Sequence, residues 1–237
     1  MRLFPFTLSI LFLGLFSCSS PKQKLPKPPV YVVSAMKNVM WKGELGSRID
    51  LDTLKKSEGL FGIGPLAGLR GEISIFKGDI YVSKMADDST QIVELNQKAS
   101  APFFVYDYEN EWQSIQLESY IKTVADLERF IDSSKFNIEK PFPFYLEGFA
   151  ESAIYHIQNL APGTKVSNPQ EAHQGQKDFF LQNEAVTLVG FFSKEHKGIF
   201  THHDRFVHIH MINQAKDKMG HLDEINMEKM TLYIPKQ

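Results

Sequence analysis

Histidine is concentrated in one part of this 237-residue chain, because six of its eight histidines lie between residues 187 and 225. Two of them, His208 and His210, sit in the apolar run 206–212, whose bulky residues predict a β-strand. Residues i and i+2 of a strand point to the same face, so these imidazoles are expected about 6–7 Å apart along it. The polar stretch 213–220 then predicts a hairpin return that brings His221 beside the pair.

Three neutral imidazoles that converge from two strands form a metal site with an open coordination position, as in catalytic zinc sites. The sequence therefore predicts that His208, His210 and His221 bind Zn2+. The same ligands would also hold other first-row divalent ions. A simpler alternative stays open, in which a half-buried strand contains the His-x-His pair by chance.

A carboxylate stands at the start of a second predicted hairpin. The segments 73–76 and 80–82 are rich in β-branched and aromatic residues, and the turn between them contains Gly78. Glu72 directly precedes the first of these segments. From its position alone it could simply be a solvated carboxylate at a sheet edge, which is the commoner case.

The elements that must position these residues are mostly short strands. A helix is predicted over 124–133 with Thr123 as its N-cap, a short helix or turn over 36–41, and a short helix over 51–56. Further strands are predicted at 30–35, 92–95, 103–108, 112–119, 152–158 and 230–234, with a strand pair within 179–192. This pattern is typical of an α+β fold with two sheets, or with one sheet and a small barrel.

The composition limits the partners to be expected, and a break in the strand pattern suggests a domain boundary. The chain has 43% hydrophobic residues, enough for a substantial core, a net charge of -2 and no basic stripe. Nucleic acid is therefore not an expected partner. The run Pro141-Phe142-Pro143 interrupts the strand pattern, so the expected boundary separates an N-terminal domain, 30–140, from a C-terminal domain, 141–237.

Residues 1–18 predict a lipoprotein signal peptide. A short positive start precedes the apolar stretch 3–16, which is too short for a transmembrane helix. The single cysteine, Cys18, ends this stretch as in a lipobox, where it becomes the lipidated first residue. Residues 19–29 are expected to form an extended tether, so the protein is expected to be exported and held at the cell envelope membrane by its lipid. The alternative is a plain secretory signal with an incidental cysteine.

Most of the chain after the tether resembles the α-acetolactate decarboxylase family. Several separated motifs carry the resemblance, and the last of them contain the three histidines. These motifs are Ser34-Ala35-Met36, the glycine-rich segment 61–72, Ala101-Pro102-Phe103, Leu146-Glu147-Gly148, Thr187-Leu188-Val189-Gly190-Phe191, His208-x-His210 and Gly220-His221.

The resemblance implies that His208, His210 and His221 hold zinc and that Glu72 is an active-site carboxylate. It implies decarboxylation of 2-acetolactate, a 2-hydroxy-3-keto acid, to acetoin and CO2, or of a related β-keto acid. Such an ion would stabilise the charge that develops as CO2 leaves, and either Glu72 or a zinc-bound water would supply the proton that follows. The fold it implies has a mixed β-sheet N-terminal domain and a smaller β-rich C-terminal domain that binds the metal, in a homodimer.

The chain departs from the family pattern at positions that bear on activity. Pro65 stands where the family usually has threonine, and Arg70 replaces the aspartate of its Asp-Gly-Glu step. His156 occupies the place of a family arginine that holds the substrate carboxylate, and histidine lacks the bidentate fork of arginine. Arg205, on an inserted loop before His208, is a candidate replacement for that guanidinium, with an ordinary surface arginine as the alternative.

Two functional hypotheses follow. The first is a zinc-dependent decarboxylase that uses Glu72, His156 and Arg205 on a small hydroxy-keto acid. The second is a non-catalytic metal-binding lipoprotein that keeps the decarboxylase fold. The departures favour the second, as does the expected location, because acetolactate is made inside cells. The other histidines of the segment before His208 are expected to be solvated loop residues: His196, His202 and His203.

Overall fold

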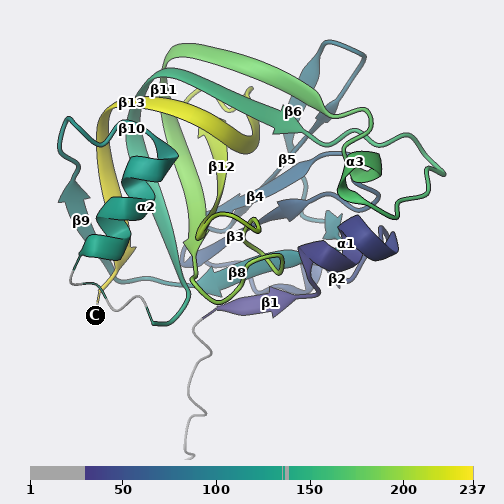
Figure 1. Cartoon of the computed structure of the whole chain (residues 1–237), viewed down its shortest axis with the longest axis horizontal. Coiled ribbons are helices and arrows are strands. Elements are labelled where there is room, and N and C mark those ends of the chain that lie inside the picture. Colours follow the sequence, from purple (N-terminus) through teal and green to yellow (C-terminus); the bar gives the residue numbers. More distant parts are fainter. Residues whose placement is uncertain (1–29, 135, 137–138, 237) are drawn as a thin grey trace, which may run out of the picture.

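The computed structural model of the protein describes residues 30–134, 136 and 139–236 (Figure 1). The signal peptide, Cys18 and the tether predicted at 1–29 lie outside the described residues. The regular structure of the described chain is mainly β-strand, and most strands belong to one six-stranded and one five-stranded sheet. In this part of the chain, no helix is both long and apolar enough to cross a membrane.

The first sheet is antiparallel throughout. Its strands are β1 (Tyr31–Val33), β3 (Leu60–Pro65), β4 (Glu72–Phe76), β5 (Asp79–Met85), β6 (Gln91–Leu95) and β8 (Phe104–Tyr108). They lie in the order β1-β8-β3-β4-β5-β6, and each pairing is antiparallel, so the expected mixed sheet is wrong. The predicted β4–β5 hairpin is confirmed. It turns at Lys77 and Gly78, both at positive φ, and so short a turn permits only antiparallel pairing.

The second sheet contains longer strands than the sequence predicted. They are β9 (Trp112–Gln116), β10 (Phe142–Ile157), β11 (Lys177–Phe192), β12 (Val207–Asn213) and β13 (Met219–Pro235). The strand pair predicted within 179–192 is wrong, because this segment lies in one strand, β11, which pairs with β10 on both sides of Asn183, a residue at positive φ. The strand of His221 likewise continues through 230–234, with irregular register against β10.

Strands β10 to β13 close on themselves, because β10 pairs with both β11 and β13, while β12 lies between β11 and β13. In Figure 1 the long strands β10, β11 and β13 curve over the top of the molecule. Strand β9 pairs with the C-terminal end of β13. Strands β12 and β13 pair within this ring, and the predicted histidine ligands lie on these two strands.

Helices are few and short. They are α1 (Met36–Lys42), the 3-10 turn η1 (Leu51–Thr53), α2 (Val124–Ser133) and α3 (Pro169–Ala172), and a small two-stranded pairing joins β2 (Ile49–Asp50) to β7 (Ser100–Ala101). The helix predicted over 124–133 is confirmed as α2. Its capping box is complete, because Thr123 Oγ1 accepts the Asp126 N–H and the Asp126 carboxylate accepts the Thr123 N–H.

Helix α2 and strand β9 precede residue 141 but belong with the second sheet. The buried face of α2, with Leu127 and Ile131, packs into the same core as Leu188 of β11 and Leu232 of β13. Sheet membership therefore crosses residue 141, and the split into domains at that point stays a prediction.

The two sheets share an aromatic core. Phe61 of β3 stacks on Tyr145 of β10 with 5.6 Å between ring centroids, and Trp112 of β9 meets each ring edge-on at 4.9 Å. Phe76 of β4 also meets Tyr145 edge-on, with 5.4 Å between ring centroids, so the same core ties β4 to the second sheet. Glu72 at the start of β4 is thereby brought to the strands that carry the histidines.

Candidate metal centre

The three predicted ligands come together at the junction of β12 and β13. Strand alternation places His208 and His210 on one face, and His221 is the ladder partner of His210, so the predicted hairpin return is confirmed. All three side chains are buried. His208 Nε2 lies 3.1 Å from His221 Nδ1, and one nitrogen of each ring lies within 4.8 Å of the other two.

Burial keeps these three imidazoles uncharged. It lowers the pKa of His208 and of His221 well below the usual value, and neighbouring histidines add to the effect. Burial and then the positive charge of His156 lower the pKa of His210 to about 3. Because a metal ion binds the neutral form of histidine, the rings stand in their ligand form at neutral pH.

A divalent ion fits this donor set. With Zn–N bonds of about 2.0 Å, two nitrogens of a tetrahedral site lie about 3.3 Å apart, close to the 3.1 Å between His208 and His221. Among the described residues, His210 Nε2 is buried without a hydrogen-bond partner. Its Nδ1 lies 3.2 Å from Ser74 Oγ, so Nε2 is the atom left for an ion.

Glu72 is buried beside the histidines, so the alternative of a solvated edge carboxylate is wrong. Its Oε1 accepts the Gln158 N–H at 3.1 Å, and its Oε2 lies 3.7 Å from His210 Nε2. Burial raises the pKa of Glu72 to about 8, against the opposing charge of His156. Gly71 before it has φ +150°, and a Cβ there would lie 2.3 Å from the Ser83 carbonyl oxygen, so glycine is required.

His156 lies behind His221, with 4.7 Å between the two ring centroids. Its Nδ1 is 2.8 Å from Asp223 Oδ2, and its Nε2 is 3.4 Å from Gln158 Nε2. Burial disfavours a charged ring, but the hydrogen bond and charge of Asp223 outweigh it and raise the pKa of His156. The side chain is thus committed to Asp223 and Gln158, and its predicted contact with substrate stays a prediction.

A cavity of about 220 Å³ opens beside His208 and His221. Its polar walls include Glu72, Gln158, His208 and His221. Much of the remaining wall is apolar and comes from α1, which Figure 1 shows beside α3, and from nearby segments. The apolar wall residues are Met36, Met40, Trp41, Pro65, Leu69 and Phe103. Pro65, in the place of the family's threonine, therefore contributes to the cavity as an apolar surface.

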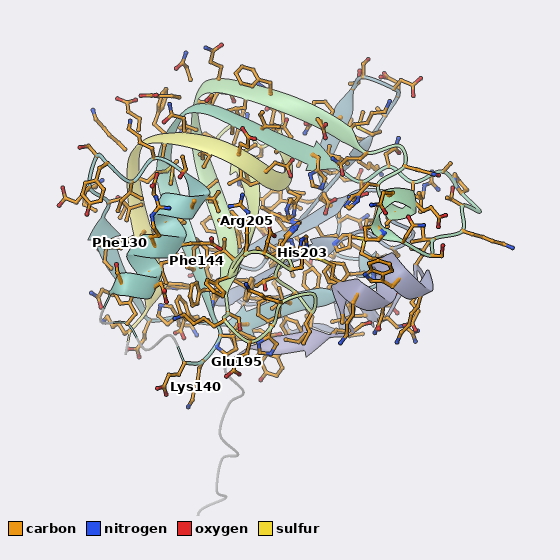
Figure 2. The ribbon with its side chains drawn as sticks, viewed as in Figure 1. Phe130, Lys140, Phe144, Glu195, His203 and Arg205 are labelled. Atoms are coloured by element: carbon orange, nitrogen blue, oxygen red, sulfur yellow. The ribbon has the colours of Figure 1, made fainter. Side chains whose placement is uncertain are left out.

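Arg205 lies on the loop 193–206 between β11 and β12, where Figure 2 labels it. It lines a second cavity, of about 320 Å³, and not the cavity that contains Glu72. His208 and His221 border both cavities. The structure therefore places Arg205 near the histidines but across them from Glu72, and its role as a carboxylate-binding group stays a prediction.

Two residues of this site carried no signal in the sequence. His202 was expected to be solvated, but its Nε2 lies 3.0 Å from His221 Nε2, so that expectation is wrong. Gln158 was not singled out, although its backbone N–H holds Glu72. Neither position follows a motif or a periodic pattern, because tertiary contacts place both. His203 is exposed as predicted, whereas His196 is half-buried and stacks on Phe200.

Comparison with known proteins agrees with this site. A sequence model described as Alpha-acetolactate decarboxylase matches residues 30–237. The chain is 27% identical over 177 residues to an alpha-acetolactate decarboxylase of Methanosarcina mazei, a match that covers 73% of this chain. It covers 58% of that relative, so the chain spans less than two thirds of the relative's length.

Solved structures show the same fold. Alpha-acetolactate decarboxylase from Bacillus subtilis strain 168 superposes with a TM-score of 0.74 at 24% identity, covering 88% of this chain and 85% of that one. A Staphylococcus aureus protein described as similar to alpha-acetolactate decarboxylase gives a TM-score of 0.73 at 17% identity, covering 86% and 84%. With the family model matched across nearly all described residues, the chain belongs to the alpha-acetolactate decarboxylase family.

Proposed function

We propose that this chain is a zinc-dependent decarboxylase that converts 2-acetolactate, or a related 2-hydroxy-3-keto acid, to the corresponding hydroxyketone and CO2. One observation carries the proposal. The neutral, buried set of His208, His210 and His221 adjoins the carboxyl of Glu72, whose Oε2 lies 3.7 Å from His210 Nε2, at a cavity of about 220 Å³. Membership of the decarboxylase family supports the same reaction.

The three histidines would hold the ion, which when bound supplies a Lewis acid for the negative charge that develops on the substrate oxygens. The chain's own residues provide the surroundings. The apolar wall formed by residues such as Met36, Met40 and Phe103 would limit the water around a bound substrate. With less water present, each electrostatic interaction inside the cavity is stronger.

Glu72 is the residue placed to manage the proton. Loss of CO2 breaks one carbon–carbon bond, and the carbon that keeps the electron pair must then take up one proton. The Gln158 N–H fixes Glu72 Oε1 at 3.1 Å, so Oε2 is held on the side of the histidines. In this proposal Glu72 delivers the proton from that side, which gives a product of one handedness.

His156 supports the position of Glu72 indirectly, through Gln158. Held by Asp223, its Nε2 lies 3.4 Å from the side chain of Gln158, the residue whose backbone holds Glu72. In the proposal His156 is a positioning residue, in place of the carboxylate-binding arginine of the family pattern.

The test is acetoin formation from racemic acetolactate by the purified protein with added zinc. A variant that combines His208→Ala with His210→Ala is the control. Turnover that requires the two histidines supports the proposal. One ion bound per chain, with no acetoin formed from this substrate, would favour instead a metal-binding lipoprotein that keeps the fold without the reaction.

We further propose, from the sequence around Cys18 alone, that the protein is exported and lipid-anchored. Cells that express the chain should incorporate labelled palmitate into it, and Cys18→Ala should abolish the label. Equal labelling of both forms would contradict the anchor without bearing on the metal centre.

A further inference from the structure

His202 contributes a fourth imidazole beside the three predicted ligands. Its Nε2 lies 3.0 Å from His221 Nε2, with 4.9 Å between the ring centroids. The contact is on the far edge of the His221 ring, because the other ring nitrogen, Nδ1, is the one that lies 3.1 Å from His208 Nε2. The two nitrogens of His221 therefore face two different histidines.

These contacts indicate that one nitrogen of His221 binds the ion and the other forms a hydrogen bond. An imidazole that binds an ion through one nitrogen carries its proton on the other, and that N–H needs an acceptor to fix the orientation of the ring. His221 Nδ1 faces the converging ligand atoms, so its Nε2–H points to His202. The hydrogen bonds found for Asp223, two residues further along the same strand, join it to His156.

The loop that carries His202 is anchored on both sides of it. Phe200 and Thr201, directly before His202, are fully buried. After it, Glu128 of α2 accepts the Phe206 N–H at 2.6 Å. The first turn of α1 also binds the loop, since the Met36 N–H donates to the Ile199 carbonyl at 2.7 Å. His202 is thus presented to His221 by a segment tied to two helices.

We propose that His202 is a positioning residue for the metal centre: it accepts the Nε2–H of His221 and so fixes the ring with Nδ1 toward the ion. This inference rests on the proposed metal-dependent function. It assigns a task to the inserted loop, whose histidines the sequence indicated only as solvated residues. The role concerns metal affinity in the first place, and activity only through it.

The experiment measures zinc affinity by competition with a chromogenic chelator, on the full chain, for His202→Ala and His202→Phe. Loss of the partner that orients a metal ligand typically lowers affinity about 10–100-fold, and we expect that loss in both variants. Phenylalanine keeps a ring in the same place but cannot accept a hydrogen bond, so it separates the hydrogen bond from packing. His202→Gln, which restores an acceptor, should recover most of the affinity.

His203→Ala is the matched control, because His203 is the next residue of the loop, is exposed, and has no ring contact with the three histidines among those found in the described chain. We expect its affinity within about twofold of the parent, a small fraction of the expected 10–100-fold loss. The visible absorption of the cobalt-loaded protein gives a second readout, which should change in His202→Ala and His202→Phe and stay unchanged in His203→Ala.

The outcomes separate this inference from the proposed function. If the parent binds one ion tightly, and His202→Ala and His202→Phe bind it as His203→Ala does, then His202 has no positioning role while the metal centre stands. If the parent itself binds no ion, or the His208→Ala/His210→Ala variant binds as tightly as the parent, the metal centre itself is wrong. Unfolding midpoints of the metal-free variants, equal to that of the parent, confirm that each variant is folded.

Discussion

Replacement of Glu72 by glutamine removes a transferable proton and keeps the shape of the side chain. The glutamine carbonyl can still accept the Gln158 N–H, which holds Glu72 Oε1 at 3.1 Å. The position is only 3% exposed, so bulk water does not reach it freely to take over. The variant Glu72→Gln therefore isolates proton delivery from positioning.

The expected size of the effect follows from the surroundings. A positioned acid contributes about 10²–10⁴-fold to a rate, or about 3–5 kcal/mol of activation free energy. His210, whose Nε2 lies 3.7 Å from Glu72 Oε2, has its pKa lowered to about 3 by burial and by the charge of His156, so it is uncharged at neutral pH and does not replace Glu72 as an acid. We therefore expect a loss of about 10³-fold or more in kcat for Glu72→Gln, with a much smaller change in KM.

The assay follows acetoin formation and its handedness from racemic acetolactate, with metal content measured in the same preparation. Glu147→Gln makes the same chemical change at a partly exposed glutamate on β10, where its carboxylate lies 3.5 Å from Lys77 Nζ, and it should leave kcat unchanged. In Glu72→Gln the residual product should lose handedness, because solvent then supplies the proton. A fully metal-loaded Glu72→Gln protein with kcat within threefold of the parent and a product of one handedness would refute the assignment.

Three further predictions concern stability. Zinc at 100 times its Kd should raise the free energy of unfolding of the chelator-stripped protein by about 2.7 kcal/mol, as measured by urea denaturation, and equal stabilisation of His210→Ala would contradict the site. Thr123→Ala should cost about 1 kcal/mol by loss of the α2 cap. The hydrogen bonds from Thr123 lower the pKa of Asp126. The stabilisation that these bonds give is therefore present above the unfolded-state pKa of about 4 and is lost as pH falls below it. A Thr123→Ala penalty that is the same at pH 2 and pH 7 would oppose this. Gly190→Ala should cost about 1–3 kcal/mol, because the added Cβ would lie 2.4 Å from the Phe144 ring, and an unchanged urea midpoint would show that the ring yields freely.

Local patterns predicted the parts of the site that lie on regular elements. Alternation along 206–212 placed His208 and His210 on one face of β12, and the turn after it returned His221 to their side. The capping residue Thr123 located the start of α2. In each case the deciding interactions lie within a few residues, so the sequence contains them.

Features decided by distant contacts could not be predicted in this way. The segment 179–192 was predicted as a strand pair, yet it lies in one strand, because β10 pairs with β11 both before and after Asn183. His202 looks like a solvated loop residue until the burial of Phe200 and Thr201 brings it against His221. Resemblance to the family assigned His156 to a substrate contact, and that stays a prediction; its hydrogen bond to Asp223 of β13 could not be read from the sequence.

The central claim is that the ion held by His208, His210 and His221 is required for decarboxylation. The most direct measurement adds zinc stepwise to the metal-free chain and records bound metal and acetoin formation together. The account predicts a rate that rises in proportion to occupancy and levels off at one ion per chain. A rate that is independent of bound zinc, or one bound ion per chain without acetoin, would contradict it.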